Sequence, residues 1–312
     1  MNIQYVEPFS RGFGRMKKAL FSPFDLKKWF VVGFTAFLSG LTDCRGGNGS
    51  GTSRRGVDWE EVIYFPQRAW EWLADNPVWA MVIAFAAFVV FVLIILCTWW
   101  SSRGKFMFLD NVVHDRAQVI APWNEYRVEG NSLFLWSLAI WAIVMAVAIW
   151  YVVRCFIAVQ ALYEASDDIR LLLGPVILMA LGFFAIFIVV GFLDIILYDF
   201  VVQIMYKGRM KTGAALRKFL TLFWSKLIYF LGYALFTLLV VLVVVIGIVV
   251  FGLLTCCIGF VLLAIPYINS VVLLPVSYTM RAFSVEFLEQ FGPEYHIFPR
   301  IESTPTTEAT IR

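Results

Sequence analysis

Long apolar runs separated by short polar segments dominate the hydropathy pattern of this chain. Four runs reach the ~20 residues that a transmembrane helix needs, and they cover residues 77–100, 133–153, 227–254 and 258–280. The runs are unbroken, whereas the strands of a membrane β-barrel would alternate apolar and polar residues over ~10 positions. The pattern therefore predicts an all-α, polytopic helical membrane protein.

A fifth apolar run, residues 171–206, is too long for one straight span. At ~1.5 Å per residue it would reach roughly 54 Å, whereas the hydrocarbon core of a bilayer is ~30 Å thick. Basic residues return only at Lys207. We therefore expect the span to end near Asp194 and residues 194–226 to form a helical hairpin on the cytoplasmic surface, with its turn at 207–212.

A sixth run, residues 29–41, is short and follows Lys27 and Lys28. It has the basic flank and brief apolar core of a signal peptide, but no small-residue cleavage site follows it. We prefer an uncleaved first helix, which gives about six transmembrane helices. Removal of part of residues 1–43 as a signal peptide is the alternative.

The charged residues predict an orientation for these spans. Residues 1–28, 101–132 and 207–226 carry clusters of Lys and Arg, and such segments stay in the cytoplasm. We therefore predict that both termini are cytoplasmic and that the loop 42–76 is outside. The expected organisation is a cytoplasmic N-terminal segment, a membrane domain with an inner loop, and a cytoplasmic tail, at residues 1–28, 29–282 (inner loop 101–132) and 283–312.

Amphipathic segments within these loops should lie at the membrane surface. Residues 58–74 of the outer loop combine several Trp and Phe residues with charges, and the inner loop 101–132 mixes acids and bases evenly. Such patterns are typical of helices that lie in the plane of the interface. We expect one helix in the outer loop and one or two short helices in the inner loop.

Composition supports the membrane class. The chain is 61% hydrophobic and 15% charged, and its mean hydropathy is +0.80, whereas soluble domains are nearer 45–50% apolar and about 25% charged. The cysteines show no metal-ligand spacing, and His114 and His296 are solitary, so we expect no metal site and no cofactor. The disulfide state of Cys44, Cys256 and Cys257 stays open.

Polar residues inside the apolar runs are the candidate binding residues. In a helix, Asp199, Gln203 and Lys207 share one face. This spacing favours an interfacial helix in which the three residues form the water-exposed side, which we call the wet stripe. Prolines at 266 and 275 should kink the last span, and polar side chains beside a kink either satisfy freed carbonyls or line a cavity. The candidates are Asp194, Asp199, Gln203, Asn269, Ser270 and Ser277.

Small residues mark two helix faces where close packing is expected. They recur at helical spacing in the second and third spans, and small side chains let helix backbones approach each other in a membrane. The pattern does not identify the packing partner, which could belong to this chain or to another. The two faces consist of Ala80, Ala84 and Ala87, and of Ala142 and Ala146.

No catalytic signature appears in the sequence. The chain has no G-x-S-x-G elbow, Walker loop, H-E-x-x-H helix or dinucleotide fingerprint. We therefore expect no enzyme, no catalytic residue and no nucleic-acid partner.

Three stretches carry a resemblance to known proteins: "PFDLKKWFVVGFTAFLSG" (23–40), "YDFVVQIMYKGRMKTGAALRKF" (198–219) and "RAFSVEFLEQFGPEYHIFP" (281–299). They resemble a group of uncharacterised bacterial polytopic membrane proteins, which is similar to the membrane domain of some glycerophosphodiester phosphodiesterases. Relatives in that group often have proline where Gln203 stands. The phosphodiesterase barrel is absent, so its activity does not carry over. The resemblance implies a six-helix domain of unknown function in the bacterial inner membrane.

Two functional hypotheses follow. The first is a structural or assembly subunit of the membrane, whose partners are membrane lipids and further copies of the chain or other membrane protein subunits. The second is a transporter or lipid-handling protein with a cavity near Asp194, Asn269 and Ser270. A transporter of ions or sugars would carry more polar residues within its spans than this chain does, so the first hypothesis is preferred.

Overall fold

The computed structural model describes residues 3–41, 59–165, 173–255 and 258–299. Within these ranges the regular elements are all helices and no strand occurs, which confirms the predicted all-α class. The elements are α1 (Val6–Phe21), α2 (Leu26–Ser39), α3 (Trp59–Asp75), α4 (Pro77–His114), α5 (Ile120–Glu125), α6 (Arg127–Ala165), α7 (Leu173–Ile195), the π-helix η3 (Ile196–Val201), α8 (Val202–Gly208), α9 (Thr212–Ser225), α10 (Leu227–Leu254), α11 (Ile258–Ala264), α12 (Pro266–Val272), α13 (Leu274–Glu289) and the 3-10 helix η4 (Pro293–Tyr295).

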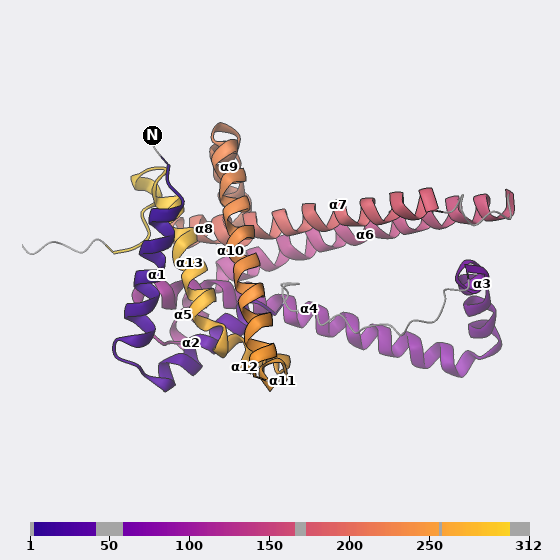
Figure 1. Ribbon diagram of the computed structural model, residues 1–312, viewed down its shortest axis with the longest axis horizontal. Coiled ribbons are helices and arrows are strands. Elements are labelled where there is room, and N and C mark those ends of the chain that lie inside the picture. The colour runs from indigo at the N-terminus through magenta and orange to yellow at the C-terminus, as the bar shows by residue number, and fades with distance from the viewer. Residues whose placement is uncertain (1–2, 42–58, 166–172, 256–257, 300–312) are drawn as a thin grey trace, which may run out of the picture.

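The helices form two parts of different character (Figure 1). At one end, α1, α2, α5, α8 and α13 gather around the C-terminal part of α4. From there α4, α6 and α7 extend in one direction, with α6 and α7 side by side and α3 at the far end of α4, while α10 runs across that direction in this view. We call the gathered end the core, and the long apolar stretches of α4, α6, α7 and α10 the apolar helices.

Among the described residues, four helical stretches are long and apolar enough to cross a membrane: Pro77–His114, Arg127–Leu162, Ile177–Gly208 and Leu227–Leu254. In their most apolar 18-residue windows, 0%, 0%, 6% and 6% of the residues are buried inside the chain. Apolar surfaces of this size are not left in water by soluble proteins. The chain is therefore a helical membrane protein.

The other two predicted spans have a different form. α2 has 14 residues and would reach about 21 Å at ~1.5 Å per residue, and it packs along the polar end of α4. There the Ser101 hydroxyl donates a hydrogen bond to the Ser39 carbonyl at 2.9 Å, and the Asn111 amide donates to the Thr35 hydroxyl at 3.3 Å. The last predicted span is divided into α11, α12 and α13, and both α12 and α13 carry a proline in their first turn, as the predicted kinks require.

The C-terminal part of α4 is the centre of the core. The first part of the predicted inner loop 101–132 is a continuation of α4 to His114, and residues 101–113 are all buried. The short helix α5 follows within the same predicted loop. Close approach of α2 explains part of this burial, because a Cβ at Gly104 would come within 2.7 Å of the Leu38 backbone. Polar residues that suggested a water-exposed loop are thus covered by neighbouring helices.

The N-terminal segment, predicted as a cytoplasmic extension, forms the amphipathic helix α1 and packs against α13. A Cβ at Gly12 would lie 2.9 Å from the Phe283 nitrogen, so the two helices touch through their backbones. The Arg15 guanidinium also pairs with the buried Glu286 carboxylate at 2.7 Å. The buried face of α1 recurs every three or four residues, as an amphipathic helix requires: Pro8, Gly12, Met16, Ala19 and Leu20.

The long apolar run does not break near Asp194. α7 leads directly into the π-helix η3 and then α8, which ends at Gly208. A left-handed residue, Arg209, follows with φ 47°, and α9 begins at Thr212. The chain thus turns between Gly208 and Thr212, where the sequence predicted a turn. The predicted break near Asp194 is wrong, because the helix continues through a π-helical turn instead of ending there. The placement of this segment on the cytoplasmic surface stays a prediction.

The outer segment 58–74, predicted to be helical, corresponds to α3, whose Trp70 and Trp72 are exposed. Cys97 and Cys155 are free thiols. Several sequence-based expectations fall outside the described residues: the signal-peptide question at 42–43, the pairing of Cys44, Cys256 and Cys257, and the tail after residue 299.

Candidate functional site

The π-helix η3 brings the predicted polar residues of the fifth span into the core. In a π-helix the backbone bonds run from i to i+5, and such turns are frequent at functional sites. The extra residue rotates the positions that follow it. Asp199 is 6% exposed and Gln203 is fully buried, while Lys207 is exposed. The predicted wet stripe is therefore wrong, because two of its three members point into the protein.

Asp199 lies against α10. The Tyr233 hydroxyl donates a hydrogen bond to its carboxylate at 3.0 Å, and both side chains are buried. A buried carboxylate needs such donors because burial of an unpaired charge is costly. This contact attaches the start of α10 to the π-helix.

Arg281 of α13 is the most deeply buried cation beside this cluster, at 1% exposure. One guanidinium nitrogen, Nη1, donates to the Tyr198 carbonyl at 2.5 Å. The guanidinium carbon also lies 4.4 Å from the centroid of the Tyr198 ring, a cation–π distance. Its Nε and Nη2 have no hydrogen-bond partner in the described part of the chain, so the Tyr198 ring is one of the contacts that stabilise the charge.

Asp194 pairs with a second buried cation. The Lys105 ammonium of α4 lies 3.8 Å from the Asp194 carboxylate and 5.3 Å from the same Tyr198 ring. Within this pair the Lys105 side chain is buried, whereas the Asp194 side chain is 36% exposed. The pair joins α4 to α7, and loss of either charge should be costly because Lys105 is buried.

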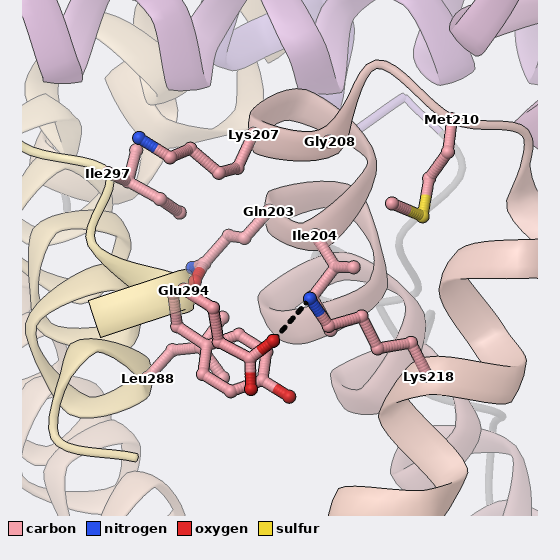
Figure 2. Close-up of a pocket in the computed structure, with 10 residues that line it drawn as sticks. Gln203, Ile204, Lys207, Gly208, Met210, Lys218, Leu288, Glu294 and Ile297 are labelled. Carbon is pink, nitrogen blue, oxygen red and sulfur yellow. Dashed lines mark ion pairs between the residues drawn. The ribbon is translucent and has the colours of Figure 1, made fainter. Parts of the chain in front are cut away.

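Gln203 borders a small hollow between α8, α9 and η4 (Figure 2). Its amide donates to the Ser284 hydroxyl at 2.6 Å, while its Oε1 has no partner among the described residues. Figure 2 shows Lys218 and Glu294 meeting at the hollow, where they form an ion pair at 2.8 Å. The space measures about 30 Å³, which is enough for about one water molecule.

The remaining predicted binding residues lie in the divided last span. Asn269 and Ser270 belong to α12 and Ser277 to α13. The Asn269 Oδ1 is buried without a hydrogen-bond partner in the described ranges. A second hollow of about 310 Å³ lies among α10 to α13, and it contains none of the predicted site residues. Its lining is Val244, Gly247, Ile248, Phe251, Gly259, Leu263, Val272, Leu273 and Val276.

A second polar cluster, centred on Asp110 of α4, was missed from the sequence. Its carboxylate is fully buried and accepts two hydrogen bonds from Arg116, at 2.7 and 3.0 Å. Tyr206 donates a further bond at 2.9 Å, and the Nδ1 of His114 lies 3.1 Å away. The helical spacing of Asp110 and His114 was the available signal, but His114 had been treated as solitary.

This cluster changes the proton affinities of its members outside the apolar helices. The hydrogen bond to Asp110 raises the pKa of Arg116. Burial raises the pKa of Tyr126, which stacks on Tyr206, to about 12. Both groups therefore keep their protons at neutral pH, Arg116 as a cation and Tyr126 as a neutral phenol. Neither of these two side chains is therefore a proton donor at neutral pH.

The two small-residue faces are not covered by any of the helices that the structure describes. Ala84 and Ala87 of α4 and both alanines of α6, Ala142 and Ala146, are exposed, and Ala80 is partly buried. Close packing against a neighbouring helix of the same chain is thus not found in the described part. Packing against another chain stays a prediction.

Among the described residues, no group of three or more His, Cys, Asp or Glu side chains is placed to hold a metal ion. The polar clusters consist instead of acids paired with Arg, Lys and Tyr. The chemistry visible at the site is therefore charge pairing and hydrogen bonding between helices, with room beside Gln203 for a molecule about the size of water.

Comparison with known families gives one match. Residues 4–297 match DUF7544, a family of unknown function, and the chain belongs to this family. Neither curated proteins nor solved structures gave a match. The expected uncharacterised family is consistent with this result, whereas the likeness to the membrane domain of glycerophosphodiester phosphodiesterases finds no support in it.

Proposed function

We propose that this family member is a non-enzymatic integral membrane protein that acts as a structural or assembly subunit in the bacterial inner membrane. The observation that carries the proposal is the near absence of burial, 0–6%, in the most apolar windows of the four membrane helices. A transporter site near the bilayer midplane is normally enclosed by packed helices of the same protein. Uncovered apolar helices instead leave surfaces for lipids and for helices of other subunits.

The small-residue faces suggest where such subunits pack. Ala84 and Ala87 share one side of α4, and Ala142 and Ala146 share one side of α6, all exposed within the chain. In lipid there is no hydrophobic drive between helices, so close contact at small residues is the main source of association. We assign these faces to contacts with further copies of this chain or with other membrane proteins.

The proposed orientation has both termini in the cytoplasm and residues 42–76 outside. Two placements support it. The helix α1 and the segment after α13 pack on the core beside the polar end of α4, while α3 lies at the opposite end of α4 (Figure 1). The core also contains the basic residues of 1–28 and 101–132, and basic segments remain inside.

The alternative is a transporter or lipid-handling protein, and the pair formed by Lys105 and Asp194 favours it. These charges lie where α7 enters the core, and ionisable residues at membrane depth often mark a substrate path. That function would require a cavity near Asp194, Asn269 and Ser270. The two hollows described above are lined by none of the three, so the assembly role has the stronger support.

Native mass measurement of the protein in lipid nanodiscs tests the assembly role. We expect a defined oligomer or a co-purified subunit, and Ala84→Leu together with Ala146→Leu should shift the stoichiometry towards the monomer. The matched control is Ala86→Leu, which adds the same side chain to an exposed position on another side of α4. A strictly monomeric wild type that accumulates a labelled solute or lipid would favour the alternative.

The orientation is tested by membrane-impermeant thiol labels in a cysteine-free background. Glu71→Cys in α3 and Lys211→Cys before α9 both replace exposed residues. In intact cells position 71 should be labelled and position 211 should be protected until the membrane is opened. The reverse pattern would contradict the proposed topology.

A further inference from the structure

Tryptophans mark the ends of the apolar stretch of α4. Trp79 lies near its start and Trp99 near its end, and the helical rise of ~1.5 Å per residue places them roughly 30 Å apart. This separation matches the thickness of the bilayer core, and tryptophan is enriched at both membrane–water interfaces. Trp99 therefore lies at the membrane surface on the side of the core.

One turn beyond Trp99, the side chain of Arg103 is held rigidly. Its guanidinium carbon lies 4.5 Å from the ring centroid of Trp99 and 4.7 Å from that of Trp123. Its Nε and Nη2 donate to the Asn131 Oδ1 at 3.4 and 3.0 Å, and the Trp99 indole donates to the same oxygen at 3.2 Å. Its third nitrogen, Nη1, has no partner within the described ranges.

A second cation lies beside this group without a balancing acid. Arg127 is the first residue of α6 and is exposed. It lies about one helical turn before Gly130, where an added Cβ would come within 2.9 Å of the Arg103 side chain, and the two positive charges repel each other. In the part of the chain that the structure describes, neither arginine forms an ion pair. Other cations of the core do, such as Lys105 with Asp194 at 3.8 Å and Arg116 with Asp110 at 2.7 Å.

Two adjacent positive charges, one of them buried, need an anion, since an unpaired buried charge is strongly unfavourable. The guanidinium group matches the oxygen spacing of a phosphate. We propose that Arg103 and Arg127 bind the phosphate of an anionic phospholipid, whose acyl chains lie along the apolar surfaces of α4 and α6. The location at the membrane surface, between Trp99 and the exposed Leu135 of α6, favours a lipid over a soluble phosphate.

Lipid titration followed by native mass measurement of the purified protein tests this proposal. Phosphatidylglycerol should bind more tightly than phosphatidylcholine, which has no net charge. Arg127→Gln should weaken phosphatidylglycerol binding about fivefold, the effect of one cation near a membrane surface, and Arg127→Lys should retain most of it. Arg127 is exposed and forms no ion pair in the described part of the chain, so the variant should fold.

The matched control is Lys17→Gln, which removes the same charge from an exposed position of α1 and should leave lipid binding unchanged. Equal losses in both variants, or equal binding of the two lipids, would overturn the site. Saturable, Arg127-dependent binding of inorganic phosphate alone would show that the anion is soluble and would overturn the lipid assignment. The readout is lipid affinity, so it is independent of the oligomeric state on which the assembly role depends.

Discussion

The two halves of α4 share one continuous helix and have opposite surroundings. In the first half, residues 77–100, the side chains are apolar and mostly exposed, and Phe88 is 63% exposed. In the second half, residues 101–113, every residue is buried, including Lys105 and Asp110. This is the reverse of the arrangement in water-soluble proteins, where apolar residues are usually inside.

The difference follows from the solvent of each half. Lipid is as apolar as the side chains of the first half, so nothing drives them to pack against each other. In the second half, polar groups are buried only because each has a specific partner, as Asp110 has in Arg116 and Tyr206. We conclude that the folding stability of the chain resides mainly in the core, and the following predictions test this contrast.

The largest effect is expected from identical substitutions in the two halves. Phe108→Ala removes a fully buried ring and should lower the free energy of unfolding by about 3–5 kcal/mol. Phe88→Ala, on the same helix, should change it by less than about 0.5 kcal/mol. Thermal or denaturant unfolding of both variants in the same detergent makes the comparison. Similar losses would show that the apolar half is packed as tightly as the core.

Charge removal should show the same contrast. Asp110→Asn leaves Arg116 without its carboxylate partner and should cost on the order of 3 kcal/mol. Asp115→Asn removes an ion pair with Lys28 whose aspartate side chain is 53% exposed, so it should cost at most about 1 kcal/mol. Asparagine also tolerates the left-handed backbone, φ 51°, at position 115. Unfolding curves of both variants at pH 7 provide the measurement. Equal stability of the two variants would contradict the prediction.

Substitution of two glycines of α1 should change stability by smaller amounts and in opposite directions. A Cβ at Gly12 would lie 2.9 Å from the backbone of α13, whereas a Cβ at Gly14 would meet no atom within 4 Å. Gly12→Ala should therefore push the helices apart and cost about 1–3 kcal/mol. Gly14→Ala should gain about 0.5–1 kcal/mol, because alanine loses less entropy in a helix. The measurement is the melting temperature of each variant relative to the wild type. A shift in the same direction for both variants would argue against the packing of α1 on α13.

The sequence predicted the features that depend on local patterns. The apolar runs correctly located the membrane-crossing stretches of α4, α6, α7 and α10, and the basic stretch after Tyr206 correctly located the turn between α8 and α9. Pro275 correctly marked a division of the last run. These features can be read from one segment at a time, since each is set by the length of a run or by a residue that cannot continue a helix.

The contacts that bury polar residues could not be predicted in this way. Asp199 and Gln203 have the spacing of an exposed stripe, yet a π-helical turn and the packing of α10 and α13 bury them. Residues 101–113 have the polarity of a loop, yet α2 and other neighbouring helices cover them. In each case the decisive partner is distant in sequence, as Ser284 is from Gln203, and periodicity carries no information about which helix faces which.

The smallest change in stability is expected at alkaline pH. It should affect the core but not the apolar helices, so the two parts can be compared in a single sample. Burial raises the pKa of Tyr126 from its ordinary 10.0 to about 12. Below pH 10 both folded and unfolded states keep the proton, and the contribution of this group to stability is constant. Above pH 10 the unfolded state loses the proton first, so stability falls as pH rises towards 12, by roughly 1 kcal/mol at pH 11. Tyr126→Phe should remove this part of the dependence of stability on pH.

Circular dichroism can follow the two parts separately during this titration. The near-ultraviolet signal reports the packed aromatic rings of the core, including the stack of Tyr126 on Tyr206 at 4.9 Å, and it should decrease between pH 10 and 12. The far-ultraviolet signal should persist, because detergent-covered apolar helices keep all their backbone hydrogen bonds internal. Simultaneous loss of both signals would mean that the apolar helices depend on the core for their helical structure, and the division of α4 into two independent halves would then be wrong.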